Sequence, residues 1–176
     1  MEKESAISLP VELKSVAQTM VFMGLSVAAF FAPFLIGHPQ WLVGTIVNTG
    51  LFLSAIFLPK RYILPAIIFP SLGVLARGIV FGPFTPFLAY FLPFIWLGNL
   101  ILILVFKRAG FVVAGLAKFL FLFLIASIYV ELNFAPVVFL QAMGVNQLAT
   151  AMAGGLLALL IFKIYGEFIS GSKEIT

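Results

Sequence analysis

Two basic side chains lie inside long apolar stretches of the sequence. Arg77 and Lys118 do not lie in a connection between two apolar runs, whereas the other eight Lys and Arg residues lie near the ends of such runs. A charge at the centre of a bilayer costs about 2.5–3.5 kcal/mol on insertion scales, so it must reach an interface, find a partner or line a cavity. Either residue can therefore extend its stem to an interface, and either can mark a binding site.

Uncharged polar residues accompany these cations. Asn99 and Lys118 are expected at similar depth, where the Asn99 carbonyl oxygen can accept from the ammonium without burial of a second charge. Most other hydrogen-bonding groups gather toward one face of the expected membrane domain. The sequence thus predicts a pocket whose candidate substrate-binding residues are His38, Gln40, Asn48, Arg77, Trp96, Asn99, Lys118, Glu131 and Gln147. The alternative is a set of scattered hydrogen bonds between helices, worth about 1 kcal/mol each.

Several kinds of chemistry lack their residues in this chain. There is no Cys, no Asp and a single His, and the sequence contains no Walker loop, no zinc-protease motif and no nucleophile elbow. We therefore expect no metal, no cofactor and no enzymatic activity. An ion-driven carrier usually places carboxylates within its spans, and none lies mid-span here. If the chain takes part in transport, its energy is expected to come from a partner.

The composition indicates which elements must position these side chains. The 176 residues are 63% hydrophobic and 9% charged, with a mean hydropathy of +1.22. Soluble domains average roughly 45–50% apolar and about 25% charged residues, so the expected solvent is lipid. The basic residues occur singly or in pairs rather than on one face, which argues against nucleic-acid binding. We expect an all-α integral membrane protein with one transmembrane domain over residues 1–176.

Apolar runs broken by Pro, Gly or paired charges predict six membrane spans. Each is about 18–22 residues long, which suffices to cross roughly 30 Å of hydrocarbon. The expected spans are residues 15–36, 41–58, 62–80, 86–106, 111–130 and 145–165.

The distribution of Lys and Arg predicts the orientation of these spans. The expected connections at one face, 37–40, 81–86 and 131–144, contain no Lys or Arg. Eight basic residues fall on the opposite face: Lys3, Lys14, Lys60, Arg61, Lys107, Arg108, Lys163 and Lys173. By the positive-inside rule this basic face is cytoplasmic, and both termini lie there. The candidate pocket is then expected to open to the outside.

Two rows of small residues recur at four-residue spacing. Gly24, Ala28 and Ala32 form one row in the first span, and Thr150, Gly154 and Ala158 form the other in the last span. Such rows let helices approach closely, either within one bundle or against another membrane subunit.

Several sequence blocks resemble a known family of small membrane proteins. These blocks are His38-Pro39-Gln40, Gly44-Thr45-Ile46-Val47-Asn48, the segment from Pro93 to Asn99, Lys118-Phe119-Leu120-Phe121, and Gln147-Leu148-Ala149-Thr150 continuing to Gly154-Gly155. Together they resemble the S-component, the substrate-binding membrane subunit of energy-coupling factor transporters. The first outer connection, residues 37–40, is shorter than the lids common in that family.

The resemblance implies a function and a set of partners. An S-component is a six-helix bundle in a prokaryotic plasma membrane that captures a vitamin or similar micronutrient, or in some members a metal ion, from outside. It docks on a membrane coupling subunit that carries two ATP-binding cassette ATPases. Gly24, Ala28 and Ala32 are similar to its small-residue docking motif. The alternative is a structural or assembly subunit of a larger membrane complex, with no ligand of its own.

Overall fold

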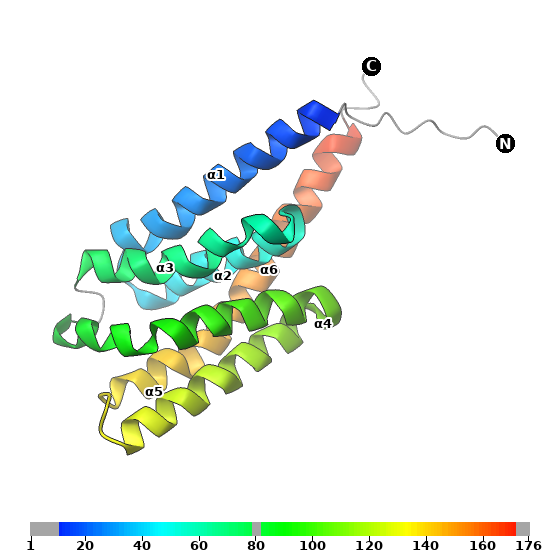
Figure 1. The fold of residues 1–176 in the computed structure, drawn as a ribbon. Coiled ribbons are helices and arrows are strands. Elements are labelled where there is room, and N and C mark those ends of the chain that lie inside the picture. Colours follow the sequence, from blue (N-terminus) through cyan, green and yellow to red (C-terminus); the bar gives the residue numbers. More distant parts are fainter. Residues whose placement is uncertain (1–10, 79–81, 172–176) are drawn as a thin grey trace.

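The structure is a computed structural model that describes residues 11–78 and 82–171 (Figure 1). Every regular element in this part of the chain is helical. The α-helices are α1 (Val11–Leu35), α2 (Gln40–Phe57), α3 (Leu64–Arg77), α4 (Leu88–Glu131), α5 (Val138–Met143) and α6 (Val145–Gly171). Short 3-10 turns, η1 (Lys60–Tyr62) and η2 (Gly82–Phe87), precede α3 and α4. Of the residues used to predict orientation, Lys3 and Lys173 lie outside the described residues.

Helix α4 is a hairpin rather than one straight rod. Its 44 residues would extend about 66 Å if straight, but the backbone leaves helical geometry at Gly110, with φ 79° and ψ 176°. The chain reverses there, and the two arms lie side by side (Figure 1). The rings of Phe91 and Tyr129, one on each arm, have centroids 5.1 Å apart. The predicted spans 86–106 and 111–130 are thus the two arms of one element, joined by a glycine corner instead of a loop.

Four elements of the described chain are long and apolar enough to cross a membrane. By length and composition these are Val16–Leu35, Gln40–Phe57, Pro83–Glu131 and Val138–Gly166. Helix α3 has 14 residues and measures about 21 Å, so it falls short of a full bilayer crossing. The prediction of a span over 62–80 is wrong at its start, because residues 60–62 form a 3-10 turn before the helix. The helix ends at Arg77, and the next residue, Gly78, adopts left-handed geometry with φ 78°.

One helix is absent from the sequence prediction. Residues 131–144 are predicted to be a connection, but Val138–Met143 form the short helix α5. Phe139 is fully buried, and its ring stacks on that of Phe91 at a centroid distance of 4.8 Å. This contact anchors α5 to the first arm of α4. Pro136 and Gly144 on either side of α5 favour a continuous loop when only the sequence is considered.

The helices form one bundle in which α6 lies against α2 and α4, while α1 lies against α3 and α2. A Cβ at Gly154 would lie 2.8 Å from the Asn48 Cβ and 2.8 Å from the Thr49 nitrogen. Only glycine permits this approach of α6 to α2 without displacement of a backbone. Ala158 is likewise fully buried. The small row of the last span therefore serves packing within the bundle.

Charged connections gather at one end of the bundle. The turn with Lys60 and Arg61 and the α4 corner with Lys107 and Arg108 lie at the end where α1 begins and α6 finishes (Figure 1). These four side chains are exposed. We call this the basic end. The opposite end holds the connections 36–39 and 132–137, which contain no Lys or Arg.

Candidate functional site

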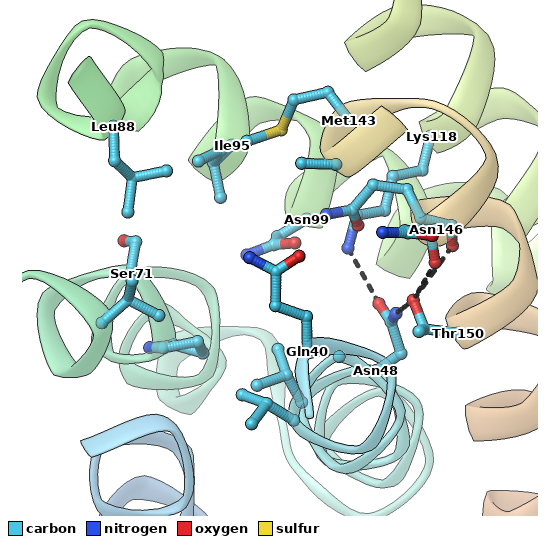
Figure 2. A pocket seen from close by; sticks show the side chains of 17 residues that line it. Gln40, Asn48, Ser71, Leu88, Ile95, Asn99, Lys118, Met143, Asn146 and Thr150 are labelled. Carbon is cyan, nitrogen blue, oxygen red and sulfur yellow. Dashed lines mark hydrogen bonds between the residues drawn. The ribbon is translucent and has the colours of Figure 1, made fainter. Parts of the chain in front are cut away.

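A cavity of about 120 Å³ lies between α2, α3, α4, α5 and α6 (Figure 2). Both arms of α4 contribute to its wall, whereas the described residues of α1 contribute nothing. Gln40, Asn146 and Gln147, near the starts of α2 and α6, are half-exposed and mark its rim on the side away from the basic end. The polar residues that line it are Gln40, Asn48, Ser71, Asn99, Lys118, Asn146, Gln147 and Thr150. An apolar cavity of about 150 Å³ accommodates benzene, so this one suits a ligand of similar size.

Lys118 reaches the cavity wall from the second arm of α4. Its side chain is buried, with 3% of its surface exposed. The Nζ atom donates a hydrogen bond of 2.8 Å to Oδ1 of Asn48 on α2 (Figure 2). Lys118 supplies the only formal charge among the described residues that line the cavity.

The hydrogen bonds beyond Asn48 form a chain whose direction is fixed. Nδ2 of Asn48 donates 3.0 Å to Oγ1 of Thr150, and this hydroxyl donates 2.7 Å to the Asn146 carbonyl oxygen. An ammonium can only donate, so Asn48 must turn its carbonyl oxygen toward Lys118 and its amide nitrogen toward Thr150. The Thr150 hydroxyl must then donate onward to a carbonyl. This relay holds the Lys118 side chain in place from the neighbouring helices.

The ammonium of Lys118 retains donor capacity after these bonds. It carries three N–H groups, and one of them is used by Asn48 within the described chain. No carboxylate of the described residues lines the cavity. A buried cation without a counter-ion is costly, and a ligand that supplies acceptor oxygens and negative charge would reduce that cost.

Asn99 does not bind Lys118, which corrects the expected pairing. Its Nδ2 instead donates 2.9 Å to the carbonyl oxygen of Ile67 on α3. Since that carbonyl can only accept, the amide orientation is fixed and Oδ1 points elsewhere. Oδ1 is buried and has no hydrogen-bond partner among the described residues. Asn99 therefore lines the cavity and holds an acceptor that no described residue uses.

The remaining predicted residues separate into two groups. Gln40 and Gln147 line the cavity together with Asn48, Asn99 and Lys118. Four residues do not line it, contrary to the sequence prediction: His38, Arg77, Trp96 and Glu131. His38 is exposed in the connection between α1 and α2, and Glu131 is exposed at the end of α4. The sequence could predict the approximate depth of these four residues along the spans. It could not predict whether their side chains lie on the side of the bundle that holds the cavity.

Arg77 closes the end of another helix. Its Nη1 donates 2.6 Å to each of the carbonyl oxygens of Phe34 and Leu35, at the last turn of α1. These carbonyls have no partner within their own helix, so the guanidinium satisfies them and opposes the negative end of the helix dipole. Arg77 therefore caps α1 and lies away from the cavity.

Trp96 does not line the cavity but binds a residue that does. Its Nε1 donates 2.7 Å to Oγ of Ser71, and that hydroxyl donates 2.9 Å to the Ile68 carbonyl oxygen. Ser71 lines the cavity, whereas Trp96 does not. The indole therefore fixes the first arm of α4 against α3 next to the site.

Three polar cavity residues are absent from the predicted site. Ser71 lies next to a helix-interrupting proline, Pro70, which also lines the cavity. Asn146 and Thr150 are four residues apart on α6, with Gln147 between them. That four-residue spacing puts Asn146 and Thr150 on one helix face and is the signal that could have revealed them.

The predicted docking row is exposed at two of its three residues. A Cβ added at Gly24 would meet no described atom within 4 Å. Gly24 and Ala28 are exposed, whereas Ala32 is half-buried. Helix α1 is also the least buried of the four candidate spans. This row therefore differs from the buried row of α6.

Neither a metal site nor a known relative marks this site. Within the described residues, no group of three or more His, Cys, Asp or Glu side chains could hold a metal ion. No protein family model, curated protein or solved structure matches the chain.

Proposed function

We propose that the protein is an integral membrane protein whose chain crosses the bilayer six times. The crossings are α1, α2, α3, the two arms of α4, and α6. Reversal at Gly110 supports the separation of α4 into two crossings of roughly 20 residues each. Helix α3 is shorter than the other crossings, with 14 residues. Six crossings return both termini to the basic end, which the positive-inside rule places in the cytoplasm.

We further propose that the protein captures a small ligand from the side opposite the basic end. One observation carries this proposal: a buried ammonium with unused N–H groups faces a cavity whose described lining contains no counter-ion. If Lys118 served only to join helices, its donors would be expected to bind neighbouring carbonyls. Here Lys118 lines a cavity instead, and the half-exposed residues at its rim provide the route to it.

The resemblance to S-components supplies the setting for this capture. On this proposal the chain is the substrate-binding subunit of an energy-coupling factor uptake transporter for a vitamin-like molecule. Helix α1 fits the docking helix, because its described residues contribute nothing to the cavity and it exposes Gly24 and Ala28. Its partners would be a membrane coupling subunit and two ATP-binding cassette ATPases, which supply the energy that this chain lacks the motifs to obtain.

A thermal-shift screen of detergent-purified protein tests the capture function. Vitamins, their precursors and divalent metals are the compounds to screen, because a ligand at 100 times its Kd stabilises the folded state by about 2.7 kcal/mol. The matched variants are Lys118→Met at the cavity and Lys107→Met at the exposed α4 corner. We expect a ligand that stabilises the wild type and Lys107→Met but not Lys118→Met.

Copurification separates this function from that of a structural subunit. A capture subunit should retain a small molecule and associate with ATPase subunits in its own membrane. An assembly subunit would bring down a membrane complex that contains no ATPase, and its stability would respond to no compound. That second pair of results would replace our proposal.

A further inference from the structure

The chemistry of the cavity wall also restricts the class of ligand, an inference that rests on the proposed capture function. We propose that the ligand is a small monocarboxylic acid with an apolar body of about the size of a benzene ring. Its carboxylate would bind Lys118 at the buried end of the cavity, and a hydrogen-bond donor on its body would reach Oδ1 of Asn99.

The charge of the wall points to an anion with a single charge. Lys118 is the one charged residue in the described lining of the cavity, which contains neither Asp nor Glu. A ligand with one negative charge would neutralise the site, whereas a dianion would leave an unpaired charge in an apolar environment. A cationic ligand would repel the ammonium. The pairing of a buried ammonium with a carboxylate also gives the shorter, stronger class of hydrogen bond.

The hydrogen-bond relay shows where the carboxylate would lie. Asn48 already occupies one N–H of Lys118, and Thr150 fixes Asn48 in that orientation. The two remaining donors match the two oxygens of a carboxylate in number. Because Lys118 and Asn48 are buried with 3% and 1% of their surface exposed, the anion would be removed from water.

The rest of the wall restricts the body of the ligand. Between the polar groups the lining is aliphatic, with Val43, Val47 and Val74 on α2 and α3. Leu88, Ile95 and Met143 continue it on α4 and α5 (Figure 2). A cavity of about 120 Å³ holds a body of about benzene size rather than a large cofactor. The unpaired Oδ1 of Asn99 requires a donor, which an unsubstituted hydrocarbon body lacks.

A series of probes with nearly the same shape tests the charge requirement without any mutation. Benzoate, benzamide and benzamidine have the same ring and differ in the charge of one planar group. Calorimetric titration of the full chain in detergent should give the highest affinity for benzoate, at least about tenfold above benzamide, and no binding of benzamidine. Acetate, which has the carboxylate without the body, should bind at least about tenfold more weakly than benzoate.

Two variants assign the recognition to named groups. Lys118→Met should lower benzoate affinity at least about tenfold while benzamide affinity changes less than about threefold. For the second group, 2-, 3- and 4-hydroxybenzoate are compared with benzoate. At least one isomer should bind the wild type more tightly than benzoate does, and Asn99→Leu should remove that advantage.

The outcomes distinguish the ligand class from the capture function. If benzamide or benzamidine equals benzoate in affinity, or if acetate does, the monocarboxylate proposal is overturned although a ligand site remains. If no probe binds but the screen of vitamins and metals yields a ligand without a single carboxylate, the class is wrong and the capture function stands; a monocarboxylic ligand from that screen supports both. If neither the probes nor the screen yields a ligand, both proposals are overturned.

Discussion

Arg77 and Lys118 are the two cations that interrupt long apolar runs of the sequence, and the structure places them in different situations. Arg77, at the end of α3, donates to two carbonyl oxygens that α1 leaves open. Lys118 donates to one side-chain oxygen and faces a cavity. In the first region Nη1 of the guanidinium satisfies the end of α1, although the buried Nε has no hydrogen-bond partner among the described residues. In the second region the helices bury the ammonium and satisfy one of its three N–H groups within the described chain.

This difference gives a criterion for function inside an apolar bundle. A cation whose donors meet backbone carbonyls lowers the energy of the folded chain by itself. A cation that retains donors beside empty space costs stability until a partner arrives. The two regions should therefore respond differently to removal of the charge, with the larger loss of stability at Arg77.

Arg77→Met should have the largest effect. It leaves the Phe34 and Leu35 carbonyls without their donor, and hydrogen bonds to a charged group contribute about 1.5–3 kcal/mol each. Because the site is partly exposed, we expect a loss of about 2–3 kcal/mol in the free energy of unfolding. Equilibrium unfolding in detergent measures it, with Arg108→Met at the exposed α4 corner as the control. A loss as small as that of the control would remove the distinction between the two regions.

Gly37→Ala should destabilise the same region by about 1–3 kcal/mol. Gly37 has a φ of 66°, which is unfavourable for alanine, and a Cβ there would meet the Arg77 side chain, with the Cδ atom 2.8 Å away. A double-mutant cycle with Arg77→Met separates the two causes. In the Arg77→Met background only the backbone cost should remain. Equal costs in both backgrounds would show that the arginine does not occupy this position.

Thr150→Val should cost about 1 kcal/mol. The substitution keeps the shape but removes the hydroxyl that accepts from Nδ2 of Asn48, so a buried amide loses a partner. Thr49→Val is the matched control, because its buried hydroxyl donates to the Thr45 carbonyl of its own helix. Unfolding of both variants under the same conditions gives the comparison. If Thr49→Val costs as much, the relay contributes nothing beyond an ordinary helix hydroxyl.

Lys118→Met should change the free energy of unfolding least, by no more than about 1 kcal/mol in the absence of ligand. Removal of the buried charge offsets the loss of the bond to Asn48, and replacement of buried charges by apolar side chains is often neutral or stabilising. The exposed Lys107→Met serves as the control in the same unfolding experiment. A loss above about 3 kcal/mol would mean that Lys118 is structural, like Arg77.

Much of the fold could be predicted from residue types along the chain. The breaks at Lys60-Arg61 and Lys107-Arg108 correctly divided the apolar runs, because charged pairs are excluded from hydrocarbon. Prediction failed where local signals were ambiguous. Pro136 and Gly144 suggest a loop around α5, yet burial of Phe139 against Phe91 stabilises a helix there.

The candidate site could be predicted only in part. Lys118 and Asn99 could be identified because burial of a polar group in an apolar helix costs free energy and indicates a specific role. Their mutual pairing was wrong because depth alone does not determine which helix faces which. The structure brings Asn48 to Lys118 and leaves Asn99 with the Ile67 carbonyl.

The sequence by itself determined the apolar character of the helices, their approximate positions and the end at which the basic residues gather. Each follows from the transfer free energy of individual residues, which does not depend on the neighbours they acquire. Only the tertiary structure decided that Arg77 caps a helix while Lys118 faces a cavity. That distinction depends on which surfaces meet, and close contacts such as Gly154 against Asn48 and Thr49 set those surfaces.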